Sequence, residues 1–153
     1  MLAFVHGGSA QLCVFEGVIQ PRLLDKTHYY VALGSGKLSA DPFLRFLVDI
    51  FCCNGPPSVS EATLLTAWAI QHVIDTNPGG VAGPIRIGVM EQNQGGGWQA
   101  RNLTDNEVDD HGQAIGSALD AMRAWRTSLS ANQPDGEAPV HPPVIPPIPQ
   151  PQA

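Results

Sequence analysis

Basic residues are scarce in this chain of 153 amino acids, which contains eight Lys and Arg against 14 Asp and Glu and has a formal net charge of −6. A nucleic-acid-binding protein needs a clustered basic face for phosphate contacts, and these eight residues are scattered along the sequence. The charge pattern therefore argues against nucleic acid as a partner.

Long apolar runs are missing as well. No stretch of about 18 apolar residues occurs, as a membrane-spanning helix would require. The segment Met1 to Val5 is too short for a signal peptide, lacks a charged start and leads directly into His6-Gly7-Gly8. These absences predict a soluble, cytoplasmic protein that does not bind a membrane.

Cysteine is rare too: Cys13, Cys52 and Cys53 are an odd number, and two of them are adjacent. Such a set makes neither a disulfide framework nor a zinc-ligand spacing. The five histidines fall in different predicted elements and share no metal-ligand spacing. We expect reduced thiols, with Cys52 and Cys53 packed at a helix end, and neither a metal nor a cofactor.

Short apolar stretches separated by turn residues are abundant in the first part of the chain. Leu2 to Val5 and Gln11 to Glu16 flank a Gly7-Gly8 turn and predict a β-hairpin. Val18 to Gln20 and Tyr29 to Leu33 predict two further strands. Four short strands in succession predict an antiparallel sheet.

The pattern then becomes helical. Asp41 can cap a helix with Pro42 at its first position, and apolar residues occupy nearly every side as far as Phe51. This pattern predicts a helix buried on most faces. Asn54 to Pro57 ends it.

Two capping boxes mark the starts of two further helices. Ser58 and Glu61 predict the start of a second helix, which should stop near Asp75. Thr104 and Glu107 predict a helix that continues to about Leu129. Between these two helices, Ile85 to Glu91 and Trp98 to Asn102 predict a second hairpin.

The order of elements predicts an α+β fold in which helices cover an antiparallel sheet. With 43% hydrophobic residues, residues 1–130 can form one domain with a substantial core. Residues 131–153 are rich in proline and nearly uncharged, which predicts a disordered, extended tail. Such a tail is either simply solvated or docks on a partner protein.

The run Tyr29 to Leu33 ends in Gly34-Ser35-Gly36, followed by the helix pair, Asp75 and the strand Ile85 to Met90. In this order, over about residues 1–103, these features resemble the second half of a proteasome β-type subunit of the N-terminal nucleophile hydrolase superfamily. The resemblance implies an αββα sandwich, with antiparallel strands packed against two central helices plus a C-terminal helix. It also implies a threonine-type endopeptidase that works in a self-compartmentalising ring.

The same resemblance assigns supporting roles to two residues. Ser35 matches the serine that hydrogen-bonds near the terminal amine of the threonine, and Asp75 matches the aspartate that helps hold that serine. Because glycine lets the chain turn sharply, we expect the backbone at Gly34 and Gly36 to face the cleft and its oxyanion. The family usually has a serine where this chain has Pro78, so one member of the supporting network is replaced.

The nucleophilic threonine and its strand belong to the family's first half, which this chain lacks according to the resemblance. We therefore expect it to be inactive alone and to bind peptide substrates only when the missing half is supplied. Self-association or related proteasome-like subunits are its expected partners. Thr27 lies in a polar loop and Cys13 in a predicted strand, so neither is a suitable replacement nucleophile.

Two alternatives remain open at this point. One is a noncatalytic assembly or interaction protein that retains the fold and uses helix faces or the Pro-rich tail to bind partners. The other is an enzyme with Ser35 as nucleophile, which has less support because no histidine lies at an informative spacing and Gly-x-Ser-x-Gly is absent.

Overall fold

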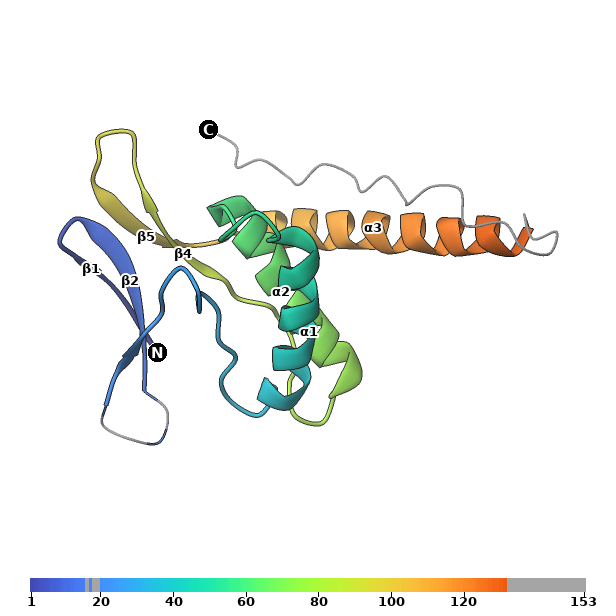
Figure 1. The fold of residues 1–153 in the computed structure, drawn as a ribbon, viewed down its shortest axis with the longest axis horizontal. Coiled ribbons are helices and arrows are strands. Elements are labelled where there is room, and N and C mark those ends of the chain that lie inside the picture. Colours follow the sequence, from blue (N-terminus) through green and yellow to red (C-terminus); the bar gives the residue numbers. More distant parts are fainter. Residues whose placement is uncertain (16, 18–19, 132–153) are drawn as a thin grey trace.

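The computed structural model describes residues 1–15, 17 and 20–131, and these form three helices and two small antiparallel sheets (Figure 1). The elements are β1 (Leu2–His6), β2 (Ser9–Val14), β3 (Arg22–Leu23), α1 (Lys37–Phe51), α2 (Val59–Thr76), β4 (Gly88–Gln92), β5 (Trp98–Asn102) and α3 (Asp105–Ala131). The fold is therefore α+β, as predicted. Residues 132–153 of the predicted tail lie outside the described residues, as do Val18 and Ile19 of a predicted strand.

The N-terminal sheet is built on the predicted hairpin. Strands β1 and β2 pair antiparallel around a two-residue turn in which Gly7 and Gly8 have φ of 57° and 78°. Positive φ at both positions suits a tight hairpin and favours glycine. Strand β3 pairs with the end of β2, opposite the buried Cys13 and Val14. This sheet stands apart from the helices on one side of the molecule (Figure 1).

The prediction of a strand at Tyr29–Leu33 is wrong. This segment runs between the N-terminal sheet and the helix pair, and no backbone hydrogen bond joins it to any other described segment. A strand exists only with a neighbour in its ladder, and none of the described strands pairs with this segment. Its β-type residues therefore stay unpaired.

Helix α1 differs from its prediction both in its first residue and in the burial of its side chains. It begins at Lys37 with Gly36 as N-cap, so that Pro42 lies inside the helix instead of at its first position. Its side chains are not buried on most faces: Leu47 is buried, whereas Phe46 and Ile50 are 54% and 47% exposed. The reason is that α1 packs mainly against α2 and has no described element on its outer side.

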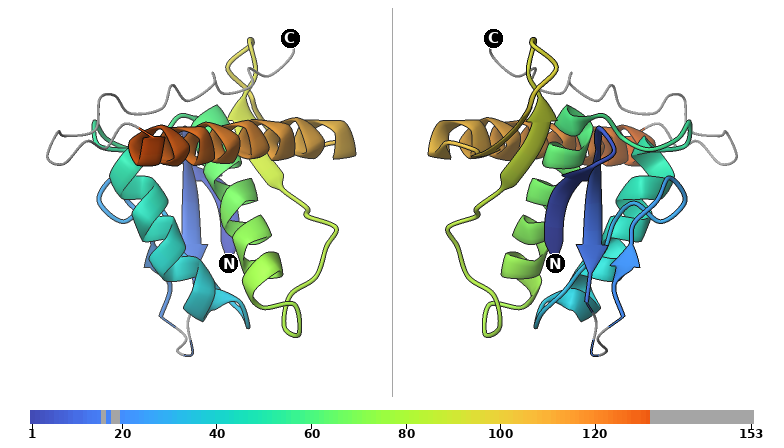
Figure 2. Two further views of the ribbon diagram at one scale, coloured as in Figure 1. Left: turned by 90° about the vertical axis from the view of Figure 1, so that its right-hand side faces the viewer. Right: turned by 90° about the vertical axis from the view of Figure 1, so that its left-hand side faces the viewer.

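Helix α2 is the centre of the core. The predicted capping box of Ser58 and Glu61 is formed, and the helix ends at Thr76, one residue beyond the predicted stop. Buried residues along α2 pack against α1 and α3 in one cluster with Leu47, Ile87 and Ile115. Figure 2 shows α1 and α2 side by side, with α3 lying across them.

The three cysteines are free thiols. Cys52 is buried at the C-terminal cap of α1, where a packed thiol was predicted. Cys53 is exposed, so its predicted packing is wrong. The chain turns toward solvent directly after the helix, and the next residue therefore leaves the core.

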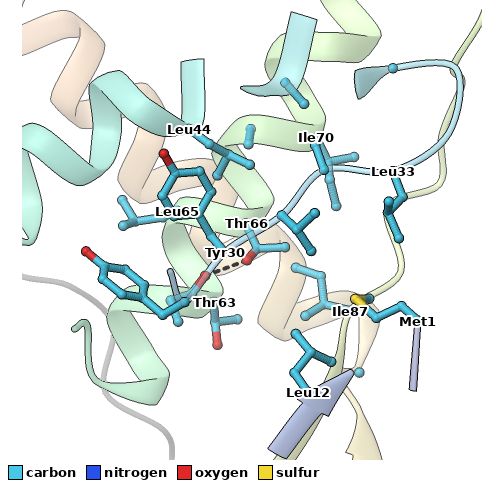
Figure 3. A pocket seen from close by; sticks show the side chains of 18 of the residues that line it. Met1, Leu12, Tyr30, Leu33, Leu44, Thr63, Leu65, Thr66, Ile70 and Ile87 are labelled. Atoms are coloured by element: carbon cyan, nitrogen blue, oxygen red, sulfur yellow. Dashed lines mark hydrogen bonds between the residues drawn. The ribbon is translucent and has the colours of Figure 1, made fainter. Parts of the chain in front are cut away.

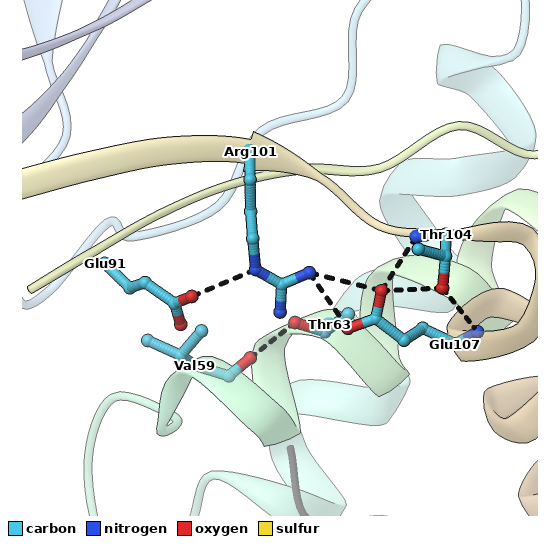
Figure 4. Close-up of polar contacts among 6 residues, drawn as sticks. All are labelled: Val59, Thr63, Glu91, Arg101, Thr104 and Glu107. Carbon is cyan, nitrogen blue, oxygen red and sulfur yellow. Dashed lines mark hydrogen bonds and ion pairs between the residues drawn. The ribbon is translucent and has the colours of Figure 1, made fainter. Parts of the chain in front are cut away.

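The second hairpin is present but shorter than predicted. Strand β4 begins at Gly88, and the preceding Ile87 packs in the core and accepts a hydrogen bond from the N–H of Leu103 at 2.9 Å. Arg101 on β5 joins this hairpin to α3 by bonding Glu91 at 3.1 Å and Glu107 at 2.9 Å (Figure 4). Glu107 also closes the predicted capping box with Thr104 at the start of α3.

Candidate functional site

An apolar groove of about 760 Å³ lies between the N-terminal sheet and the helix pair. Ala3 and Leu12 line it from the sheet, Leu44 from α1 and Leu65 from α2. The unpaired segment Tyr29–Leu33 runs along it, as the labelled side chains in Figure 3 show. The groove therefore brings together strands and helices that are distant in the sequence.

The side chains of the groove provide little reactive chemistry. None of the described lining residues carries a carboxylate, amine, guanidinium or imidazole side chain. The hydroxyls of Thr63 and Thr66 donate to the carbonyl oxygens of Val59 and Ala62, each at 2.6 Å, so their protons are used inside α2. Apart from the phenols of Tyr29 and Tyr30, the described lining residues thus carry no side chain that could act as a general base.

The turn Gly34-Ser35-Gly36 lies at one end of Tyr29–Leu33 and leads into α1. Gly34 has φ of 88°, a conformation that favours glycine. A Cβ atom on Gly36 would lie 2.8 Å from Cγ1 of the buried Val73 on α2. Glycine is therefore favoured at position 34 by the backbone conformation and at position 36 by the close approach of α2, and Ser35 lies between them.

Ser35 donates its hydroxyl proton to the carbonyl oxygen of Gly80 at 3.0 Å. A hydroxyl has one donor and two acceptor positions, so Ser35 Oγ can still accept a hydrogen bond from another group. The N–H groups of Gly34 and Gly36 make no hydrogen bond within the described part of the chain. This end of the groove thus offers one acceptor and two backbone donors.

Asp75 is not joined to Ser35 as the sequence led us to expect. Its carboxylate is exposed and accepts a hydrogen bond from Nε2 of Gln71 at 2.7 Å, within α2. The turn that begins at Asn77, where Gly80 donates its N–H to the Asn77 carbonyl at 3.0 Å, brings the Gly80 carbonyl to the serine instead. The sequence shows that a turn follows α2, but not which of its carbonyls reaches Ser35.

Tyr29 and Tyr30 are lining residues to which the sequence analysis assigned no role at a site. Tyr29 lies near Cys52, and burial together with the neighbouring thiol raises the pKa of Tyr29. Burial likewise raises the pKa of the Cys52 thiol. Tyr30 lies near Arg45. These contacts attach the start of the unpaired segment to α1, whereas Ser35 attaches its far end to the turn after α2.

A second groove, of about 820 Å³, lies between α2 and α3 and is lined by Ile74, Pro84 and Val108 among others. Within the described ranges, no three His, Cys, Asp or Glu side chains gather as metal ligands would. No helix in the part of the chain that the structure describes is long and apolar enough to cross a membrane.

Comparisons with protein-family models, with curated proteins and with solved structures give no match to this chain.

Proposed function

We propose that this chain is the second half of a proteasome-like subunit of the N-terminal nucleophile hydrolase superfamily, acting in a cytoplasmic ring. In this proposal the groove is the place where the remaining strands of an αββα sandwich pack. The observation that carries it is the unpaired backbone of Tyr29–Leu33, which lies against apolar side chains and ends at Ser35. A strand with apolar side chains on one face would supply the missing ladder and fill the groove.

The chemistry of a threonine peptidase explains what Ser35 would do in such a complex. The threonine hydroxyl attacks the peptide carbonyl, and the threonine's own amine takes the hydroxyl proton and passes it to the leaving amine. The ester that forms is then hydrolysed by water. The free lone pairs on Ser35 Oγ can accept a hydrogen bond from that amine and hold it in position.

The backbone donors fit the same chemistry. A tetrahedral intermediate carries an oxyanion that N–H groups can stabilise, and Gly34 and Gly36 have such groups without a described partner. The described lining contributes no carboxylate or imidazole as a base, which agrees with a mechanism in which the nucleophile brings its own. The chain alone is therefore expected to be inactive.

A synthetic strand tests this proposal. The purified chain is mixed with a short peptide that begins with a free threonine and continues with alternating apolar and polar residues. Amide hydrogen exchange of Tyr29–Leu33 and hydrolysis of a fluorogenic peptide are then measured. We expect protection of these amides and the appearance of hydrolysis. An N-acetylated peptide of the same sequence should bind equally and give no hydrolysis, because its amine is blocked.

One observation favours a second candidate function, a noncatalytic assembly protein that retains the fold. Asp75 bonds to Gln71 and not to Ser35, and Pro78 has no hydroxyl to extend the network. In that case the chain would bind partners through helix faces or the Pro-rich tail, and the synthetic strand would give no hydrolysis. Absence of binding by any strand-forming peptide would contradict the peptidase function.

A further inference from the structure

The outer side of helix α1 carries an exposed apolar row. Leu38, Pro42, Phe46 and Ile50 follow one another at intervals of four residues, which places them along one ridge of the helix. All four are exposed, and Leu38 is 90% exposed. Large apolar side chains gathered along one helix are unusual on a free surface and mark a site of association.

A charged row of the same spacing runs beside it. Lys37, Asp41, Arg45 and Asp49 each precede one apolar residue, so their signs alternate along the helix as plus, minus, plus and minus. Arg45 and Asp49 are close enough to pair within the helix, with Nε 3.1 Å from the carboxylate. Both side chains are largely exposed and can also reach a neighbouring molecule.

The sign alternation makes this face complementary to a second copy in one orientation. When two α1 helices run antiparallel, Lys37 faces Asp49 of the other copy and Asp41 faces Arg45. With the two-fold axis between residues 43 and 44, Leu38 also lies opposite Ile50 and Pro42 opposite Phe46, and both sets of pairs match to within one residue, about 1.5 Å along the helix axis. Parallel helices in register would instead place like charges together, which is unfavourable.

We infer that two copies of this chain associate through α1, antiparallel and about a two-fold axis. Such an interface is isologous: each pair of opposite charges occurs twice, and the two apolar rows pack as ridges of four-residue spacing. Ala40, Leu44 and Val48, which line the groove, lie on the opposite side of α1. The dimer therefore leaves the groove open, and this inference does not depend on the proposed peptidase function.

The test uses the full 153-residue chain in sedimentation-velocity experiments over a range of concentrations. The wild-type chain should shift from monomer to dimer as its concentration rises. Arg45→Asp should weaken the dimer at least tenfold, because the new carboxylate faces Asp41 of the other copy. Arg123→Asp, the same change on exposed α3, should leave the dimer unaffected.

A second variant tests the same charge pair from the other side. Asp41→Arg alone should also weaken self-association, because two guanidinium groups then face each other. An equal mixture of the Arg45→Asp and Asp41→Arg chains should form a heterodimer, since every opposed pair is again of opposite charge. Circular dichroism spectra like that of the wild-type chain should show that both variants are folded. A monomer at all concentrations, or a dimer that neither variant weakens, would overturn the inference.

Discussion

The hydroxyl of Ser35 donates a hydrogen bond of 3.0 Å to the carbonyl oxygen of Gly80, 45 residues later in the chain. This bond ties the turn before α1 to the turn after α2, so both ends of the helix pair meet beside the groove. It also orients Ser35 Oγ so that its lone pairs remain available. The candidate site is therefore held by backbone packing and one side-chain contact, without the carboxylate that the sequence suggested.

Replacing Ser35 should lower peptide hydrolysis strongly while changing the stability of the fold only slightly. Ser35→Ala removes one exposed hydrogen bond, which should lower the free energy of unfolding by about 1 kcal/mol or less. In the complex with a free-threonine peptide it should lower hydrolysis on the order of 100-fold, because the amine loses its positioning contact. Urea denaturation and the fluorogenic assay measure the two effects. Ser39→Ala, in the first turns of α1, is the matched control and should leave hydrolysis unchanged; an equal loss there would contradict a specific role for Ser35.

The close approach of Gly36 to α2 gives a steric prediction. Gly36 has φ of −81°, which any residue can adopt, so the cost of Gly36→Ala comes from its contact with Val73. We expect destabilisation by about 1–3 kcal/mol, typical of an overpacked core, measured by denaturant unfolding. Gly79→Ala should be nearly neutral, because a Cβ there meets nothing within 4 Å. In a Val73→Ala background the cost of Gly36→Ala should fall; an unchanged cost would show that the two sites are uncoupled.

The capping box of α2 should make stability depend on pH in acid. Hydrogen bonds from the Ser58 side chain and then its backbone N–H lower the pKa of Glu61 below 4.5. The ionised form is therefore favoured in the folded state, and its stabilisation is present above pH 4.5 and lost as pH falls through the folded pKa. Ser58→Ala should cost about 1 kcal/mol at neutral pH and flatten this acid dependence in thermal unfolding.

Ser117→Ala, within α3, serves as the control for that substitution. Its hydroxyl donates to the carbonyl of Gln113 inside the helix and caps no N–H group. Because alanine is the better helix former, stability should stay the same or rise slightly. If Ser58→Ala and Ser117→Ala had the same effect, the capping box would not contribute as described.

The burial of His111 should make the stability of the fold depend on pH in a second range, above that of Glu61. The side chain is 7% exposed, and its Nδ1 has no hydrogen-bond partner among the described residues. Burial lowers the pKa of His111 below 6.5, although the negative charges of Asp110 and Glu107 act to raise it. The unfolded chain then binds a proton more readily, so stability falls as pH falls from 6.5 through the folded pKa. A proton NMR titration should give a pKa under 6.5 for this imidazole, and His111→Leu should remove that slope. A pKa at or above 6.5 would contradict the burial of a neutral ring.

Local signals in the sequence predicted much of the fold. Both hairpins form where glycine-rich turns separate β-type residues, and both capping boxes begin helices at Ser58 and Thr104. These features succeed because their hydrogen bonds connect residues within a few positions of each other. Tertiary context decided the rest: Pro42 was expected to begin α1 after an Asp41 cap, yet the observed cap is Gly36, five residues earlier.

The candidate site was predicted less well, because its contacts join distant residues. Gly34-Ser35-Gly36 was identified from its sequence, but its partner could be named only by resemblance, and Gly80 takes the place of Asp75. The strand pattern of Tyr29–Leu33 is real, but its pairing depends on a neighbour that no local signal supplies. The structure added Tyr29 and Tyr30, whose contacts with Cys52 and Arg45 become visible only in three dimensions.

Amide hydrogen exchange at Val31, Ala32 and Leu33 tests the central claim most directly, since these residues carry the unpaired backbone beside the groove. The account predicts fast exchange in the chain alone and protection when the free-threonine strand peptide is added. The amides of β4 and β5, already paired in their own hairpin, should change little. Slow exchange in the chain alone, or no added protection at saturating peptide, would contradict the claim that this groove receives a strand.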